Sequence, residues 1–307
     1  MEPRVVVVRR TTEYESLLVE HGTVQMARFR LELMGQSMDK VERMHAVTLK
    51  VAAHALRDVP HTWRKTSCLR SDLDRFVFQP GDIIVAVGQD GLVPNVAKYL
   101  DGQTVAGINP DTSYKAKMMV WREREIPLLY GYLKNNTAKL QRRSMVEVEI
   151  KDDETQEEGR KIIALNELFC GHHSHQSAKY DIAYEQHTEY QSSSGMIISS
   201  GTGCTGWASS VASQRRNPLP FPEPEEGVLI FQVREAWDSP FSGVSIQQGY
   251  VEPDAPLKVT SRMQEGGVIF GDGIESDRLE FAWGQTATFK VSGKTLNLMV
   301  RTGTRGR

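Results

Sequence analysis

The sequence predicts a two-domain protein, with an α/β first half on a mostly parallel sheet and a β-rich, sandwich-like second half. Three observations predict this class. The chain has 307 residues, enough for two domains of roughly 150 residues each. Strand-like and helix-like segments alternate over the first half, and near residue 145 they give way to short segments of alternating apolar and polar residues. We assign residues 1–144 to the α/β domain and residues 145–307 to the β-rich domain.

The first half contains the parts of a βαβ unit. Residues 4–10 include four consecutive valines, typical of a strand buried on both faces. Over residues 37–56, apolar side chains recur every three or four positions, which predicts an amphipathic helix. Residues 82–87 form a second apolar strand, a glycine-rich turn and a helical pattern over 95–100 follow, and 104–108 form a third strand. This order is typical of a parallel sheet.

The second half consists of short strands. Residues 146–150 alternate apolar and charged side chains, and 162–165 follow an acidic turn, so we expect a hairpin. Alternating prolines over 217–224 exclude a helix or a central strand, and we interpret this segment as an exposed loop or spacer. Further alternating strands are expected at 180–184, 257–261, 287–291 and 296–300.

Composition excludes several classes of protein. Lys and Arg number 37 against 39 Asp and Glu, a net charge of −2, so nucleic acid is not expected as a partner. The three cysteines, Cys68, Cys170 and Cys204, form no CxxC pair, which argues against a disulfide framework or zinc ribbon and favours a reducing compartment. No apolar stretch approaches the ~18 residues of a membrane span, and no signal peptide is recognisable. We expect a cytoplasmic protein without a membrane partner.

The first candidate site is the turn 88–91, which follows an apolar strand and precedes a helix. Open α/β sheets bind ligands beyond the carboxyl ends of their strands. Glycines let the backbone approach a phosphate closely, and a helix start supplies amide donors. Asp90 would accept the proton of a substrate hydroxyl or assist a metal from its outer shell. An ordinary Asp-Gly turn is the alternative interpretation.

The second candidate is the loop 199–207, which follows the strand 196–198 and leads into a small-residue helix over 208–212. Its hydroxyls alternate with glycines, so it can offer donors to a phosphate or a base edge. It is neither a Walker A loop nor a GxGxxG fingerprint.

Two smaller groups of polar residues complete the survey. The pair Asn166 and Glu167 can hydrogen-bond ribose hydroxyls or an adenine edge. His172, His173 and His175 lack the companions of a zinc site, so we expect them to form a polar loop rim.

Taken in order, these segments resemble those of the NAD kinase family. The turn 88–91, the Gly-Ile-Asn of 107–109, the pair 166–167 and the loop 200–207 are similar to the family's GGDGT, GIN, NE/ND and TPTGSTAY segments. The Gly-Asp-Gly of 271–273 resembles its closing DG segment. The similarity extends over roughly residues 80–300.

The resemblance implies an active site between an α/β domain and a β-rich domain. It implies transfer of a phosphoryl group from ATP, with Mg²⁺ or another divalent cation, to the 2′-hydroxyl of the adenosine ribose of NAD, giving NADP. It also implies a homo-oligomer, a dimer or tetramer. Asp90 would be the catalytic residue, and the nucleotide-binding residues would be Gly88, Gln89, Gly91, Asn109, Asn166, Glu167, Thr202, Gly203 and Thr205.

The sequence departs from the family pattern at positions that touch the substrates. Gln89 replaces a glycine, Leu92 replaces a threonine, and Gly201 replaces a proline. These changes leave two alternatives open. One is a kinase of the same superfamily that acts on a sugar, polyol or lipid hydroxyl. The other is a nucleotide-binding regulator without catalysis.

Overall fold

The computed structural model describes residues 2–111, 113–151 and 159–301, and they form two compact units. Unit 1 comprises Met1–Gln141 and the chain from Asn297 onward, and unit 2 comprises Arg142–Leu296. The sequence assigned all of 145–307 to the second domain. In the structure, the chain from Asn297 onward belongs to unit 1 instead, because Asn297 and Leu298 pair in parallel with Thr104 and Val105 of the unit 1 sheet.

Unit 1 is built on a fully parallel sheet in the order β2-β1-β3-β4-β16. The valines of β1 lie at its centre and are at most 1% exposed, as expected for a strand covered on both faces. The strands of unit 1 are β1 (Arg4–Arg9), β2 (Arg64–Leu69), β3 (Asp82–Val87), β4 (Thr104–Ile108) and the last residues of β16 (Thr286–Val300).

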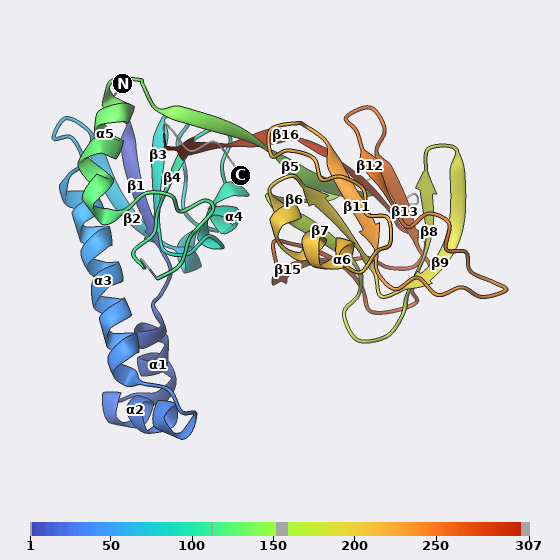
Figure 1. The fold of residues 1–307 in the computed structure, drawn as a ribbon, viewed down its shortest axis with the longest axis horizontal. Coiled ribbons are helices and arrows are strands. Elements are labelled where there is room, and N and C mark those ends of the chain that lie inside the picture. The colour runs from blue at the N-terminus through green and yellow to red at the C-terminus, as the bar shows by residue number, and fades with distance from the viewer. Residues whose placement is uncertain (1, 112, 152–158, 302–307) are drawn as a thin grey trace. The chain divides into compact units, whose positions relative to one another are not determined.

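Helices cover this sheet. Side chains from α3 and α5 pack against alternate residues of β1, β3 and β4 on one face. Figure 1 shows these two helices next to each other beside the sheet. All six residues of α4 are buried. No helix in the described ranges is long and apolar enough to cross a membrane. The helices of unit 1 are α1 (Glu13–His21), α2 (Val24–Leu33), α3 (Met38–Arg57), α4 (Leu92–Ala97) and α5 (Ile126–Lys134), with short 3₁₀ turns at Arg70–Asp72 and Glu123–Glu125.

The apolar stripe of α3 serves two separate cores. Met38 and Val41, near its start, pack with side chains of α1 and α2, whereas Val51 and Ala55, near its end, pack on the parallel sheet. Between the two, Val47 is 37% exposed. The sequence did not predict α1, α2, β2 or α5.

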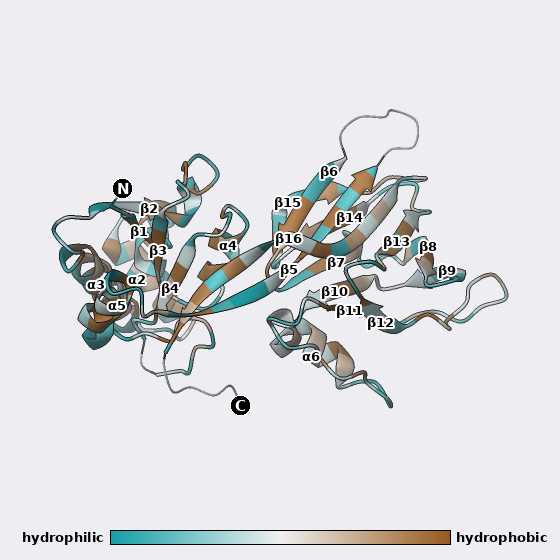
Figure 2. Ribbon diagram, turned by 90° about the horizontal axis from the view of Figure 1, so that it is seen from above, coloured by the Kyte–Doolittle hydropathy of each residue, from teal (hydrophilic) through white to brown (hydrophobic). Residues whose placement is uncertain are grey.

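Unit 2 is a sandwich of two antiparallel sheets. One runs β12-β11-β10-β7-β14-β15, and the other contains β9, β8, β13 and parts of β16 and β5, with β6 paired to β5. Alternating hydrophobic and hydrophilic residues along these strands are visible in Figure 2. The elements are β5 (Lys139–Lys151), β6 (Arg160–Ala164), β7 (Glu167–His172), β8 (Ala178–Tyr184), β9 (His187–Ser193), β10 (Met196–Ser200), the 3₁₀ turn Gly203–Thr205, α6 (Trp207–Ala212), β11 (Leu229–Val233), β12 (Gln248–Val251), β13 (Leu257–Ser261), β14 (Gly267–Gly271) and β15 (Ile274–Glu280).

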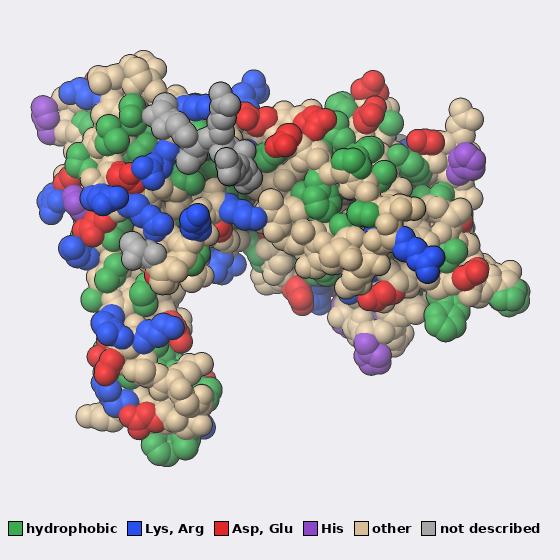
Figure 3. Space-filling view, in the orientation of Figure 1, with side chains coloured by type: hydrophobic (Ala, Val, Ile, Leu, Met, Phe, Trp, Pro, Cys, Tyr) green, Lys and Arg blue, Asp and Glu red, His purple; other side chains and the backbone are tan. Residues whose placement is uncertain are grey.

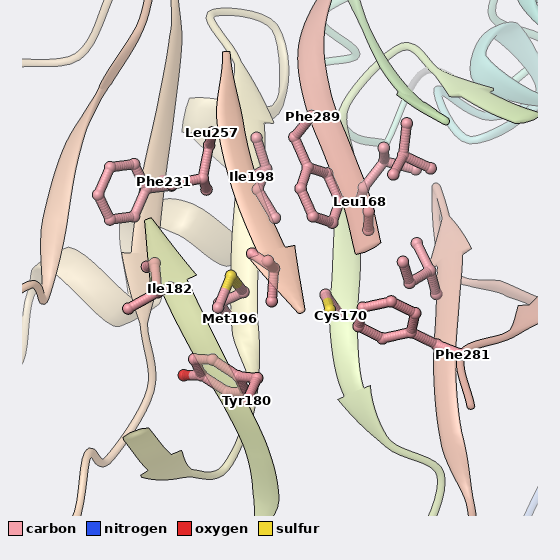
Figure 4. Close-up of a cluster of buried hydrophobic side chains, with 14 of the residues drawn as sticks. Leu168, Cys170, Tyr180, Ile182, Met196, Ile198, Phe231, Leu257, Phe281 and Phe289 are labelled. Carbon is pink, nitrogen blue, oxygen red and sulfur yellow. The ribbon is translucent and has the colours of Figure 1, made fainter. Parts of the chain in front are cut away.

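The core of unit 2 lies between the two sheets. Leu168 and Cys170 of β7 meet Phe289 of β16 and Tyr180 of β8, and all four are fully buried (Figure 4). Such dense apolar burial is the main stabilising term of a sandwich. The predicted class, an α/β domain with a mostly parallel sheet and a β-rich sandwich, is confirmed.

Three local predictions need correction. The helix predicted over 95–100 is α4, which begins at Leu92, because Pro94 is tolerated in a first helical turn. The strands predicted at 287–291 and 296–300 are one long strand, β16. The proline-rich segment 217–224 has no helix or strand, as predicted, but its end is not a free spacer: Pro222 is buried, and the carbonyl of Pro224 accepts a hydrogen bond from the Ser144 amide.

Candidate functional site

Asp90 organises the loop that follows β4. Its Oδ2 accepts the amide of Lys117 at 2.7 Å, and its Oδ1 accepts the amides of Met118 and Met119 at 2.9 and 3.0 Å. A carboxylate has about four acceptor positions, so three are occupied and one remains. The residue predicted to be catalytic therefore also anchors the segment 117–119.

Glycines make this arrangement possible. A Cβ on Gly107 would lie 2.5 Å from the carbonyl oxygen of Met118, so only glycine lets that segment pack on β4. Gly88 has a φ of 154°, which side-chain-bearing residues rarely adopt. Close packing of the segment 117–119 on β4 thus explains Gly107, and the backbone conformation explains Gly88, whereas a Cβ on Gly91 would lie 3.4 Å from a guanidinium nitrogen of Arg10. Gln89 is exposed beside them.

Asn109 is buried, at 1% exposure, and its side chain serves its own loop. Its Oδ1 accepts the amide of Asp111 at 2.8 Å, and its Nδ2 donates to the carbonyl of Tyr114 at 3.4 Å. The Tyr114 hydroxyl, by contrast, is buried without a hydrogen-bond partner in the described part of the chain. Burial and the negative charge of Asp90 raise the pKa of Tyr114. That orphaned hydroxyl is a polar group near Asp90 that the sequence did not single out.

Two arginines meet beside the turn 88–91. Arg10 donates to the carbonyl of Gly91 at 3.0 Å and to Oδ1 of Asn95 at 3.3 Å, and Arg70 donates to that same oxygen. Loss of hydration and the charge of Arg70 lower the pKa of Arg10. Two guanidinium groups that share one neutral acceptor form a site that an anion would stabilise. No sequence pattern indicates this pair, because the two residues lie 60 positions apart.

The balanced net charge conceals an uneven distribution. Unit 1 has 23 Lys and Arg against 16 Asp and Glu, a net charge of +7, whereas unit 2 has 14 against 23, a net charge of −9. Figure 3 shows the basic side chains gathered over the visible face of unit 1. A polyanionic ligand at the turn 88–91 would therefore meet a positive field.

In unit 2, Asn166 and Glu167 form a corner between β6 and β7 that Asp272 holds. The carboxylate of Asp272 accepts the amide of Leu165 at 3.0 Å and that of Asn166 at 2.7 Å, and its own amide donates to the carbonyl of Glu167. Asp272 has a positive φ of 53°, a conformation that is uncommon for residues other than glycine. The Gly-Asp-Gly segment noted in the sequence therefore hydrogen-bonds to Asn166 and Glu167 through Asp272.

The loop 199–207 packs directly on that corner. Ser200 donates through Oγ to the Leu165 carbonyl at 2.5 Å and accepts the amides of Thr202 and Gly203 at 3.2 and 3.4 Å. A Cβ on Gly203 would lie 2.3 Å from the carbonyl oxygen of Asn166, so this position requires glycine. The structure therefore brings together Asn166, Glu167, Thr202 and Gly203.

Close packing and hydrogen bonds also hold Gly201 and Thr205 of this loop. A Cβ on Gly201 would lie 2.4 Å from the backbone of Glu223, so the end of the proline-rich segment packs on this glycine. Thr205 is exposed, and its hydroxyl donates to the Thr202 carbonyl at 3.3 Å. Glycine thus occupies the position at which the resemblance would place proline.

The carboxyl group of Glu167 has a strongly shifted pKa. Burial and the neighbouring charge of Asp272 raise its pKa from 4.5 to about 7. A carboxyl group that is half protonated near neutrality can both accept and donate a proton. Burial, together with the charge of Glu167, also raises the pKa of Cys204 to about 11, so its thiol stays protonated.

The residues around Asp90 in unit 1 and those around Asn166 and Glu167 in unit 2 present different chemical groups to a ligand. Unit 1 presents a carboxylate with one open acceptor position and a pair of arginines beside a glycine turn. Unit 2 presents an amide side chain and a carboxyl group that titrates near neutrality. Within the described residues, no cluster of three or more His, Cys, Asp or Glu could hold a metal ion.

Together, the parallel α/β unit and the antiparallel sandwich define the class of fold seen in NAD kinase-like proteins. No protein-family model matches the sequence, and no curated protein matches it. Among solved structures, the yeast NADH kinase complexed with NADH has a similar fold, with a TM-score of 0.62 and 11% sequence identity. The similarity covers 98% of this chain and 84% of that chain. At this identity the likeness shows the fold alone.

Proposed function

We propose that this protein is a phosphotransferase that moves a phosphoryl group from ATP to the 2′-hydroxyl of the adenosine ribose of NAD, giving NADP. The observation that carries the proposal is the corner of unit 2. There Asn166 and Glu167, the glycine-rich loop 200–203 and Asp272 are connected by hydrogen bonds between side-chain oxygens and backbone groups. The proposal is supported by the resemblance of these same segments to NAD kinases and by the shared fold.

Under this proposal, Asp90 acts as a carboxylate held in a fixed position beside the substrate hydroxyl. Phosphoryl transfer depends mainly on alignment of the nucleophile and on electrostatic stabilisation of the transferred group. Three amides fix the Asp90 carboxylate, and its remaining acceptor position would orient the ribose hydroxyl and take up its proton. Arg10 and Arg70 would bind phosphate oxygens of ATP, since each guanidinium keeps further donors.

In unit 2, Asn166 and Glu167 would bind the ribose and adenine side of NAD. An amide side chain supplies both a donor and an acceptor, which suits an adenine edge, and a carboxyl group suits vicinal hydroxyls. Within the described residues, the hydrogen bonds of Asn166 are made by its backbone N–H and carbonyl, and none is made by its side-chain amide. That amide is therefore free to bind a ligand.

We propose that the divalent cation arrives with the nucleotide. Mg²⁺ is usually held by substrate phosphates, waters and one or two carboxylates, so no cluster of three protein ligands is required. Asp90 is the carboxylate of unit 1 that could assist it from the outer shell. The cation would supply charge neutralisation at the transferred phosphoryl group.

The test is a direct assay. The purified chain is incubated with ATP, MgCl₂ and NAD, and NADP is measured with an NADP-specific dehydrogenase. We expect NADP to form, and Asn166→Ala to lower kcat/KM for NAD at least about tenfold, as expected when a hydrogen bond to substrate is lost. Asp101→Asn, at an exposed carboxylate of unit 1, is the matched control and should retain activity.

The outcomes separate the parts of the proposal. If the wild-type chain forms no NADP with ATP or polyphosphate as donor, the assignment of NAD as acceptor fails. If NADP forms but Asn166→Ala is as active as the wild type, the proposed NAD subsite is wrong. Asp90→Asn should abolish turnover, and circular dichroism must accompany it because Asp90 also anchors 117–119.

Two observations favour a second candidate, a nucleotide-binding regulator without catalysis. Asp90 already accepts three amides, and Leu92, at the position of a family threonine, is fully buried. Both features give the turn 88–91 a structural role. This candidate predicts calorimetric binding of ATP or NAD without turnover of NAD or of any sugar, polyol or lipid alcohol.

A further inference from the structure

The helix α2 has apolar side chains on two faces, and only one of them is packed. Ala27 and Leu31 lie in a small core with side chains of α1 and α3. Met26, Phe29 and Leu33 recur at intervals of three and four residues, so they share another face, which we call the α2 stripe. All three side chains are exposed, and Figure 3 shows hydrophobic side chains over α2. A surface helix normally turns polar side chains to water, so the stripe indicates a docking surface.

A second exposed apolar surface lies in unit 2, on the turn 237–242 between β11 and β12. Trp237 is 69% exposed and Phe241 is 86% exposed. The turn is held internally, because Ser239 and Ser242 exchange backbone hydrogen bonds at 3.2 Å and their hydroxyl oxygens lie 2.7 Å apart. The amide of Trp237 also donates to the carbonyl of Ser192 on β9. Aromatic side chains on a fixed backbone lose little conformational freedom on binding, a property of anchor residues at protein interfaces.

Each of the two surfaces carries one charge of opposite sign. Arg30 lies four residues after Met26, so it stands on the same face as the stripe. Arg28 pairs with Asp39 and with Glu42, whereas Arg30 makes no ion pair within the described residues. Asp238, next to Trp237, is exposed and likewise makes no ion pair in that part of the chain.

The charges of the two units have the same opposite signs. Unit 1, which contains α2, has a net charge of +7, and unit 2, which contains the turn 237–242, has a net charge of −9. Long-range attraction therefore favours contact between unit 1 of one copy and unit 2 of another. The two surfaces are complementary in charge, and both are apolar.

We propose that the α2 stripe of one copy of this chain docks on the turn 237–242 of a second copy. Trp237 of the partner subunit and Phe241 of the partner subunit cover the stripe. Asp238 of the partner subunit pairs with Arg30. Met26 fits around the aromatic rings because its thioether side chain is unbranched and flexible. Since every copy has both surfaces, a two-fold dimer contains this contact twice.

A lipid surface matches these features less well than a second copy does. Anionic headgroups attract basic segments and repel acidic ones. The turn 237–242 contains Asp238 and belongs to a unit of net charge −9. A membrane would engage the α2 stripe alone and leave the aromatic side chains of the turn in water. Contact between copies covers both surfaces at once.

The experiment measures self-association of the full chain by sedimentation velocity from about 1 to about 200 µM, a range that detects weak interfaces of modest size. We expect the mass to rise from that of one chain toward that of two. Phe29→Ser and Phe241→Ser should each raise the dissociation constant at least about tenfold, as is typical of an aromatic anchor. The matched control is Val77→Ser, at an apolar side chain of unit 1 that is exposed but lies outside the stripe.

An exchange of charges tests the pairing itself. Arg30→Asp and Asp238→Arg should each weaken association about tenfold or more, because each places like charges opposite one another. An equimolar mixture of the two variants should associate nearly as tightly as the wild type, since every contact of the mixed pair joins opposite charges. A defect in folding would not be repaired by mixing. Glu265→Arg, at another exposed carboxylate of unit 2, is the control and should leave association unchanged.

Three results would overturn the proposal. The first is a chain that stays monomeric up to about 200 µM; if this monomer binds vesicles of phosphatidylcholine and phosphatidylserine, the stripe docks on lipid instead. The second is association that Phe29→Ser and Phe241→Ser leave unchanged. The third is a mixture of the charge variants that associates no more tightly than either variant alone. None of these readouts depends on NADP formation, so the proposed kinase activity and this contact can fail separately.

Discussion

Replacing Glu167 by glutamine should remove a pH dependence from the stability of unit 2. Burial and the charge of Asp272 raise the pKa of Glu167 from 4.5 to about 7 in the folded protein. Between these pH values the folded state keeps a proton that the unfolded state has released. The free energy of unfolding therefore falls as the pH rises from 4.5 to 7, and it changes little from this group outside that window.

The magnitude follows from the shift. A change of about 2.5 pKa units at roughly 1.4 kcal/mol each corresponds to about 3.5 kcal/mol, and partial exposure of the side chain reduces this to about 2 kcal/mol. Glu167→Gln is uncharged at every pH and keeps the shape of the side chain. Relative to the wild type, it should stabilise unit 2 by about 2 kcal/mol at pH 8 and by nearly nothing at pH 4.5.

The assay should report unit 2 alone, because two units need not unfold together. Hydrogen exchange of β7 peptides in increasing urea gives the opening free energy of the strand that contains Glu167. Comparing variant with wild type at each pH cancels the intrinsic exchange rate. Glu265→Gln, at an exposed carboxylate of the same unit, is the control and should match the wild type at every pH. A difference between Glu167→Gln and wild type that is the same at pH 5 and pH 8 would refute the reasoning.

Three further predictions follow from local geometry. Gly203→Ala should destabilise unit 2 by at least about 2 kcal/mol, since its methyl group would meet the Asn166 carbonyl, whereas Gly293→Ala, with open space around it, should cost under about 1 kcal/mol in urea unfolding. Asp90→Ala should release the segment 117–119, so that its amides exchange at least tenfold faster while those of β11 are unchanged. The buried cysteines 68, 170 and 204 should not react with a thiol reagent at pH 8 until denaturant is added, because burial raises the pKa of each thiol; rapid labelling in the native protein would contradict this.

The strands and turns of unit 1 were predictable because their signals are local. Four consecutive valines define β1, and a glycine-rich turn after an apolar segment defines the end of β3. The helices α1 and α2 were not predictable in the same way. Their apolar residues pack largely on each other and on the start of α3, and much of their surface, including Phe29 at 55% exposure, remains open.

The motifs themselves were legible in the sequence, but their physical roles were not. Asn109 was predicted to close the nucleotide site near the phosphates, and the structure adds that its side chain hydrogen-bonds to its own loop. That role of Asn109 stays a prediction. Asp90 was predicted to act on a substrate, and the structure adds that it anchors three amides from residues 117–119. Local patterns cannot reveal such bonds, because the partners are separated by more than 25 positions.

By itself, the sequence determined the two kinds of sheet, since the spacing of apolar side chains fixes which faces must be buried. Tertiary structure alone decided the electrostatics. It placed the charge of Asp272 near Glu167 and brought two arginines to the side-chain oxygen of one asparagine. It also divided a chain of net charge −2 into one basic and one acidic unit. The reason is that charges interact through space over several ångströms and depend on burial, and neither distance nor burial is a property of local sequence.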